Sequence, residues 1–231
     1  MNVDREHRDR LAKAIRQYLA AECSAFTFDD VIHNICDSSD DPTISYVTRS
    51  VWCHYDDCKD HTVNLSKEEW DYFQRMLLLL ESDAQIEETR VKTWCFSQLV
   101  ALIGMAIFCA SAVALGFGYH LFILVIPFGI LSVGLSKWRR RRRPHLTAYE
   151  RSLVPFSSVA ELLAVRRSVE GFVKQKYPES LRSRRIRSPF MERLMWLQNH
   201  VLWMLFSPFV LVVQLLPETE LRRGELRCGC K

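Results

Sequence analysis

A cluster of cysteine, histidine and aspartate side chains is the part of the sequence whose residue types could carry chemistry. It runs Cys53-His54-Tyr55-Asp56-Asp57-Cys58-Lys59-Asp60-His61. Cysteine and histidine bind zinc when four ligands converge tetrahedrally, and carboxylates bind harder cations. In a helix, His54, Cys58 and His61 would share one side, because positions i, i+4 and i+7 lie above one another. The candidate zinc ligands are therefore Cys53, His54, Cys58 and His61.

The spacing within this cluster also fits a surface without a metal. Cys53 and Cys58 are five positions apart, whereas strong zinc motifs place two ligands much closer together. A solvated helix end explains the same residues, since Lys59 and His61 would favour its last carbonyl groups. The chain also contains no nucleotide-binding loop or hydrolase motif. The sequence therefore favours a non-enzymatic protein, with no catalytic residue assigned.

The elements that would position the cluster are helices. Their signals are apolar residues at helical spacing over 4–22, a capping arrangement of Thr27 with Asp30, the helix start Asp41-Pro42, and the capping box Ser66-x-x-Glu69. A further helical run is expected from Glu81 onward. Residues 1–90 are thus predicted to form an acidic cytosolic domain of about four helices.

Charge is segregated along the 231 residues, whose net charge is +4. Residues 1–89 carry ten more acidic than basic side chains, and residues 137–231 carry twelve more basic than acidic ones. Residues 90–136 contain only Arg90 and Lys92 as charged groups. The opposite charges suggest that the two ends dock, within a chain or between chains, and salt should weaken that docking.

Two uncharged apolar segments at about 94–116 and 119–136 are long enough to cross a bilayer, which needs roughly 20 residues of helix. We expect a transmembrane hairpin over residues 91–138. Basic residues flank both of its ends and are absent from its turn, so both ends should be cytoplasmic. No ionisable residue lies deep in either segment, which argues against a pump or carrier.

Small side chains in these segments indicate where helices could approach closely. The candidate helix-packing residues are Gly104, Ala106, Ala110 and Ala114 in the first segment and Ser132 and Ser136 in the second. They could pack within the hairpin or between copies of the chain. Assembly between copies would also permit an oligomeric membrane pore or effector.

A third apolar stretch covers residues 194–216, and Ser188-Pro189 marks a helix start before it. Gln198-Asn199-His200 and Pro208 interrupt it. It could span the membrane, re-enter it or lie in the interface. Because both flanks are basic, we expect a helix that does not cross, followed by a tail at 217–231.

Residues 139–193 form a basic juxtamembrane region. Ser158-x-x-Glu161 begins an amphipathic helix there that should continue to Pro178. The candidate lipid-binding residues are Lys137, Arg139, Arg140, Arg141, Arg142, Arg143, Arg182, Arg184, Arg185 and Arg187. Anionic headgroups attract such side chains by about 1 kcal/mol each. Nucleic acid is a less favoured partner, since no recognition motif accompanies the arginines.

Two runs, 55–61 and 69–83, resemble segments of uncharacterised bacterial inner-membrane proteins. The second run is Glu69-Trp70-Asp71-Tyr72-Phe73-Gln74-Arg75-Met76-Leu77-Leu78-Leu79-Leu80-Glu81-Ser82-Asp83. In those proteins an acidic helical module precedes a transmembrane hairpin, and the resemblance covers roughly residues 1–140. It implies a bacterial inner-membrane location and attaches no activity.

The predicted fold class is all-α: a cytosolic helical bundle, a two-helix transmembrane hairpin, and a basic helical region with a third hydrophobic helix. The predicted function is a membrane-anchored, non-enzymatic interaction or scaffold protein. Its expected partners are anionic lipids, a cytosolic protein and a second copy of the chain. The alternatives are a metal-dependent enzyme or sensor at the 53–61 cluster and an oligomeric pore.

Overall fold

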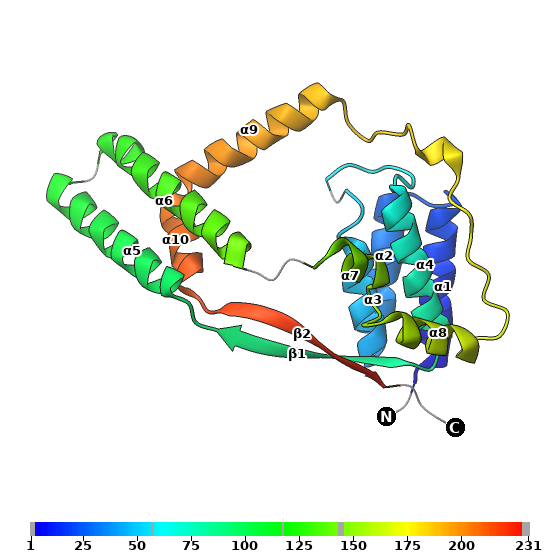
Figure 1. The fold of residues 1–231 in the computed structure, drawn as a ribbon. Helices are drawn as coiled ribbons and strands as arrows, with labels where there is room; N and C mark the ends of the chain where they lie inside the picture. Colours follow the sequence, from blue (N-terminus) through cyan, green and yellow to red (C-terminus); the bar gives the residue numbers. More distant parts are fainter. Residues whose placement is uncertain (1–2, 57, 117, 143–145, 228–231) are drawn as a thin grey trace. The chain divides into compact units, whose positions relative to one another are not determined.

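A computed structural model describes residues 3–56, 58–116, 118–142 and 146–227 of the chain. Its elements, in chain order, are α1 (Arg5–Leu19), α2 (Ala25–Asp37), α3 (Pro42–Trp52), α4 (Lys67–Glu81), β1 (Gln85–Thr93), α5 (Phe96–Leu115), α6 (His120–Arg142), α7 (Ala148–Leu153), α8 (Val159–Ser168), the short 3-10 helix η1 (Glu179–Leu181), α9 (Pro189–Leu205), α10 (Ser207–Leu215) and β2 (Glu218–Arg227) (Figure 1). The described chain is mostly helical, as predicted.

The chain divides into two compact units. Unit 1 consists of Met1–Thr89, Leu146–Ile186 and Arg222–Lys231, and unit 2 consists of Arg90–His145 and Arg187–Leu221. Each unit is therefore assembled from segments that are distant in the sequence.

Unit 1 has a hydrophobic core built around α1 and α4. Leu11 and Ile15 of α1 and Phe73 of α4 are fully buried, and α2 and α3 pack beside them. The middle segment of the chain completes this core, because Phe156, Val165, Phe172 and Leu181 are buried in the same cluster. These four apolar residues of 146–186 thus pack against protein, whereas others such as Leu163 and Val173 are exposed.

The helix predicted from Ser158 to Pro178 is shorter than expected. It is α8, which ends at Ser168, and Gly171 follows with φ 84°, a conformation that suits glycine. Beyond it, the backbone of Gln175 is held by two side chains of α4: Trp70 Nε1 donates to its carbonyl, and its N–H donates to Gln74. These hydrogen bonds replace those that a continued helix would have made.

An ion pair deep in unit 1 joins α1 to the start of α3. Both Arg8 and Asp41 are fully buried, and Arg8 Nε donates to Asp41 Oδ2 over 2.6 Å. Arg8 Nη2 donates to the other carboxylate oxygen, Asp41 Oδ1, over 3.0 Å, and Nη1 donates to the carbonyl oxygens of Ser82 at 2.8 Å and Ala84 at 2.9 Å. One guanidinium therefore connects α1, the α3 N-terminus and the turn that follows α4.

The all-α prediction is corrected by β1 and β2, which pair in a two-stranded sheet. The sequence predicted a helical run from Glu81, but α4 ends there and β1 follows. Its Thr89, Val91 and Thr93 are β-branched and alternate with basic residues, which is the period of a strand. Thr93 Oγ1 donates to the Glu218 carbonyl, so the end of β1 lies beside the start of β2 and the strands run antiparallel.

Unit 2 contains α5, α6, α9 and α10. By length and composition, α5 and α6 are apolar enough to cross a membrane, and α9 with α10 would add a third span if that pair were continuous. The pair is bent by 75° at its break. α10 packs against both α5 and α6, while α9 contacts α6.

Candidate functional site

The predicted zinc ligands do not share a helix. α3 ends at Trp52, and Cys53 is its C-cap residue, so the helix through 53–61 that would have aligned them is absent from the described residues. Cys53 and Cys58 are both exposed. Asp57, which belonged to the same cluster, lies outside the described residues. The expected i, i+4, i+7 alignment is therefore wrong, because the chain turns after Cys53.

The two histidines of the cluster have separate hydrogen-bond partners. His54 Nδ1 lies 3.3 Å from Glu69 Oε1. The backbone N–H of Asp56 donates to His61 Nε2 over 3.0 Å, which leaves Nδ1 as the protonated nitrogen that donates to the Thr62 carbonyl. Within the ranges that the structure describes, no three His, Cys, Asp or Glu side chains are placed to hold a metal ion. Zinc binding stays a prediction.

His54 instead lines a pocket that we call the α4 pocket, with a volume of about 510 Å³. Its lining residues are His54, Glu68, Glu69, Asp71, Tyr72, Arg75, Leu146, Ala148, Arg151, Ser152 and Val154. They come from the chain after α3, from α4, and from the segment that includes α7. All of them belong to unit 1, so two distant stretches of sequence meet at this pocket.

Glu69 is the fixed anion of the α4 pocket. It completes the capping box with Ser66 at the start of α4, as the sequence predicted. The hydrogen bond from His54 is the main reason that the pKa of Glu69 falls from 4.5 to about 2, and bonds from Ser66 lower it further. Glu69 is therefore ionised at neutral pH and can accept hydrogen bonds but not donate a proton.

Arg75 and Arg151 supply the positive charge of the pocket. Arg75 Nε donates to the Val154 carbonyl over 2.5 Å, and its guanidinium lies 5.8 Å from the ring centre of Tyr72. Burial lowers the pKa of Arg75 below its ordinary value. The Ser152 hydroxyl donates to the Tyr149 carbonyl, so its proton is already committed. Charged and aromatic groups of this kind suit the binding of a ligand.

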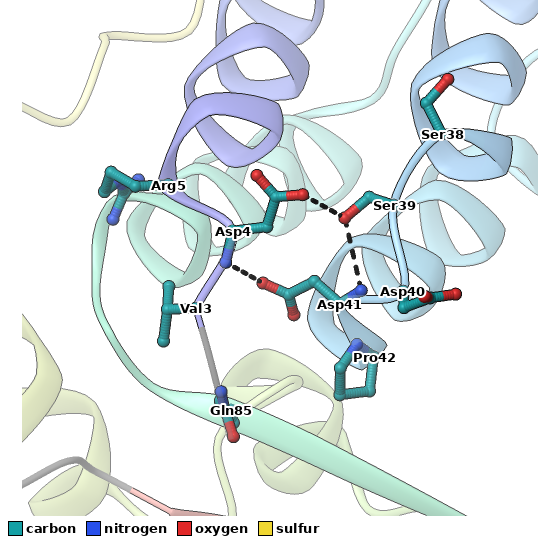
Figure 2. Close-up of a pocket in the computed structure, with 9 residues that line it drawn as sticks. All are labelled: Val3, Asp4, Arg5, Ser38, Ser39, Asp40, Asp41, Pro42 and Gln85. Atoms are coloured by element: carbon teal, nitrogen blue, oxygen red, sulfur yellow. Dashed lines mark hydrogen bonds between the residues drawn. The ribbon is translucent and has the colours of Figure 1, made fainter.

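A second pocket, of about 580 Å³, is rich in carboxylates whose hydrogen bonds are internal (Figure 2). Asp4 accepts from Ser39, and the backbone N–H of Asp4 donates to Asp41. Hydrogen bonds from Ser39 and His7 lower the pKa of Asp4 to about 2. Because the neighbouring Asp41 also carries the Arg8 ion pair, we assign this pocket a structural role.

The predicted lipid-binding arginines occupy two places. Arg182 and Arg184 line a third pocket of unit 1, of about 660 Å³, where Arg184 donates to the Val63 carbonyl. Arg185 is exposed, and Arg187 begins the second segment of unit 2. Lys137, Arg139, Arg140, Arg141 and Arg142 lie at the end of α6, and Arg143 lies outside the described residues. Lipid binding by these side chains stays a prediction.

Arg139 has protein partners instead of open solvent. Its Nε lies 2.9 Å from Ser97 Oγ and 3.1 Å from Glu218 Oε1, and it also donates to the Gln214 carbonyl over 2.5 Å. Polar residues at the ends of the apolar stretches were the one feature of the sequence that pointed to this cluster. It ties the start of α5, the end of α6 and the end of α10 together.

The predicted helix-packing residues divide into two groups. Gly104, Ser132 and Ser136 lie at helix contacts: a Cβ on Gly104 would approach Leu131, and both serines are hydrogen-bonded to Gln214. By contrast, Ala106, Ala110 and Ala114 are exposed. The face of α5 that packs inside unit 2 is marked by Ala101 and Gly104, which are buried. The alanine stripe thus lies on the outside of unit 2.

No protein-family model, curated protein or solved structure matches this chain. The resemblance to uncharacterised bacterial membrane proteins therefore stays a prediction.

Proposed function

We propose that the chain is a membrane-anchored, non-enzymatic interaction protein that presents unit 1 at the cytoplasmic face of a bacterial inner membrane. One observation carries the proposal: a unit with its own hydrophobic core is continuous in sequence with two helices that are apolar enough to cross a bilayer. Basic residues at both outer ends of that helix pair, Arg90 and Lys92 before α5 and Lys137 to Arg142 in α6, support the cytoplasmic orientation.

The α4 pocket is the surface that we assign to partner contact. Its volume of about 510 Å³ falls within the range of small-ligand pockets, roughly 300–1,000 Å³. Arg151 and Glu68 are exposed at its rim, while Tyr72 and Arg75 are half-buried deeper in it. A peptide segment of a cytosolic protein with both acidic and apolar side chains fits this combination of charge and aromatic surface.

Membrane anchoring is tested first, with the full chain expressed in a bacterial host. Membranes are washed with alkaline carbonate, which strips peripheral proteins. The chain should remain in the pellet, because α5 and α6 are held by the hydrophobic effect and not by charge. Recovery of the chain in the supernatant would contradict the proposal.

Partner contact is tested by affinity capture of the tagged chain from detergent-solubilised membranes. Arg151→Glu reverses a charge at the rim of the α4 pocket, and Arg10→Glu makes the same change at an exposed position of α1. The partner proteins captured by the wild type should be lost with Arg151→Glu and retained with Arg10→Glu. Equal capture by both variants would remove the α4 pocket from the proposal.

Self-association is a second candidate activity, favoured by the exposed alanine stripe of α5. Ala106, Ala110 and Ala114 leave a shallow surface on which a second helix could pack closely. Ala110→Leu should reduce chemical cross-linking between copies in membranes, whereas Val113→Leu enlarges a side chain that is already bulky and exposed and should not. Cross-linking unchanged by Ala110→Leu would exclude this surface.

A further inference from the structure

The topology of α9 and α10 follows from the way unit 1 is assembled. Unit 1 includes Leu146–Ile186, which precedes the pair, and the segment that begins at Arg222, which follows it. Phe156 and Leu181 of the first segment are buried in the same core as α1 and α4. The segment from Arg222 continues β2, which pairs with β1, the strand that follows α4. Segments that share one core or pair in one open two-stranded sheet lie on one side of a bilayer, because such a polar backbone cannot remain in hydrocarbon.

Because all segments of unit 1 lie on one side, each stretch that connects two of them crosses the membrane an even number of times or not at all. The stretch between Thr89 and Leu146 holds α5 and α6, and two crossings bring the chain back to its starting side. The stretch between Ile186 and Arg222 holds the bent pair α9–α10 and, after it, the start of β2. A single crossing there would separate Arg222 from the rest of unit 1, so the pair has to leave and return on the same side.

Hydrogen bonds inside unit 2 indicate independently that α10 runs back toward the side on which α6 ends. Ser207 Oγ at the start of α10 donates to the Val125 carbonyl, whereas Gln214 Nε2 near its end donates to Ser136 Oγ over 2.9 Å. α10 therefore runs alongside α6 in the same direction. Arg139 then donates to the Gln214 carbonyl, so α10 finishes at the basic end of α6.

The break between α9 and α10 lies beside α6, near the middle of its apolar part. A Cβ added to Gly129 would lie 3.0 Å from the Cα atom of Met204, and Trp203 Nε1 donates to Ser132 Oγ over 2.9 Å. Gly129 precedes Arg139 by ten residues, which is about 15 Å along a helix, or roughly half of a 30 Å hydrocarbon core. The 75° bend lies at this depth.

The surface of α9 indicates what surrounds it. None of its residues is buried by the described parts of the chain, and its exposed side chains include Phe190, Leu194, Trp196, Leu197 and Val201. Lipid can cover such a surface, and the exposed Arg185 just before it suits anionic headgroups. The polar run Gln198-Asn199-His200 is less costly in a helix of limited depth than at the centre of a straight span.

We propose that α9 and α10 form a re-entrant element in which α9 enters the bilayer from the side of unit 1, reaches the depth of Gly129, and α10 returns to the same side. Lipid of that leaflet covers α9. This inference rests on the membrane anchoring proposed above, but it does not depend on which face of the membrane carries unit 1.

The test is to locate three points of the full chain across the membrane. Epitope tags are placed, one per variant, before Met1, after Gly118 in the α5–α6 turn, and after Lys231. Protease is added to intact spheroplasts and to inside-out vesicles, and the tags are detected by immunoblotting. We expect the two terminal tags to be protected in spheroplasts and digested in inside-out vesicles. The Gly118 tag should behave in the opposite way and serves as the control for protease access.

The relation between the two terminal tags decides the inference. If the tag after Lys231 is digested in spheroplasts while the tag before Met1 is protected, α9–α10 crosses the bilayer and the re-entrant element is refuted. If both terminal tags are digested in spheroplasts, the cytoplasmic orientation is refuted while the re-entrant element stands.

Discussion

Removing the negative charge of the buried Arg8–Asp41 pair should destabilise unit 1 severely. Asp41→Asn keeps the shape of the side chain and a good N-cap residue for α3. It leaves the Arg8 guanidinium with the Ser82 and Ala84 carbonyl groups but with no counter-charge. Burial disfavours the ionised form of Asp41, yet its bonds with Arg8 hold its pKa below 3.8, so the native pair is charged at neutral pH.

The expected magnitude follows from the complete burial of both side chains. Breaking a buried ion pair by neutralising one partner costs about 3–5 kcal/mol of unfolding free energy, because the other charge stays desolvated. For a chain of this size, about 2–4 °C of Tm corresponds to each kcal/mol, so Tm should fall by about 6–20 °C. Thermal unfolding of the full chain in detergent micelles, followed by near-ultraviolet circular dichroism, measures the change.

Two further variants make the measurement specific to the buried pair. Asp40→Asn removes a neighbouring carboxylate that is exposed, and its Tm should change by less than about 2 °C, since surface substitutions are usually within 0.5 kcal/mol. Arg8→Met combined with Asp41→Asn leaves no buried charge and should recover part of the lost stability. Equal Tm values for Asp40→Asn and Asp41→Asn would refute the reasoning.

Three other perturbations test separate features. Because the folded-state pKa of Glu69 is about 2 against an ordinary 4.5, its contribution is present above pH 4.5 and lost as pH falls toward 2; Glu69→Gln should therefore flatten the fall in Tm over that window. Gly129→Leu should lower Tm, because overpacking costs typically 1–3 kcal/mol, whereas Gly134→Leu should not, since no atom lies within 4 Å of its added Cβ. Raising salt from 0.1 to 1 M should leave residues 146–186 as resistant to protease as before: the partly exposed Lys174–Asp71 ion pair is screened, but the packing of the buried apolar residues is not weakened. Faster cleavage at high salt would instead support docking by charge.

Local signals predicted the helix starts well. The N-cap residues Asp41, Ser66 and Ser188 are where the sequence placed them, because each side chain bonds to a backbone N–H only two or three positions away. The cap expected at Thr27 is wrong: α2 begins three residues earlier, after Ser24, whose side chain accepts from the Thr27 N–H. Both residues are good caps, and packing of the helix decides between them.

Long-range packing was the part that the sequence did not predict. The packing of Phe156 and Phe172 into the core of unit 1 depends on residues of α1 to α4, which end at Glu81, and no local pattern encodes contacts over that separation. The hydrogen-bond acceptors of Arg8 are also distant in the sequence, since its carbonyl acceptors lie in the turn after α4. The α4 pocket is formed by this packing, and its arginines gave no signal of their own in the sequence.

The order in which the ribosome makes the chain has a consequence for residues 146–186, which complete the core of unit 1. The core around α1 and α4 is synthesised first, but Phe156 to Leu181, which complete it, follow both long apolar helices. At about 5–20 residues per second, residue 181 appears roughly 5–20 seconds after residue 89. During that interval the apolar helices enter the insertion machinery, while the core around α1 and α4 still has an uncovered hydrophobic surface. Chaperone demand should therefore peak while the membrane helices are being inserted.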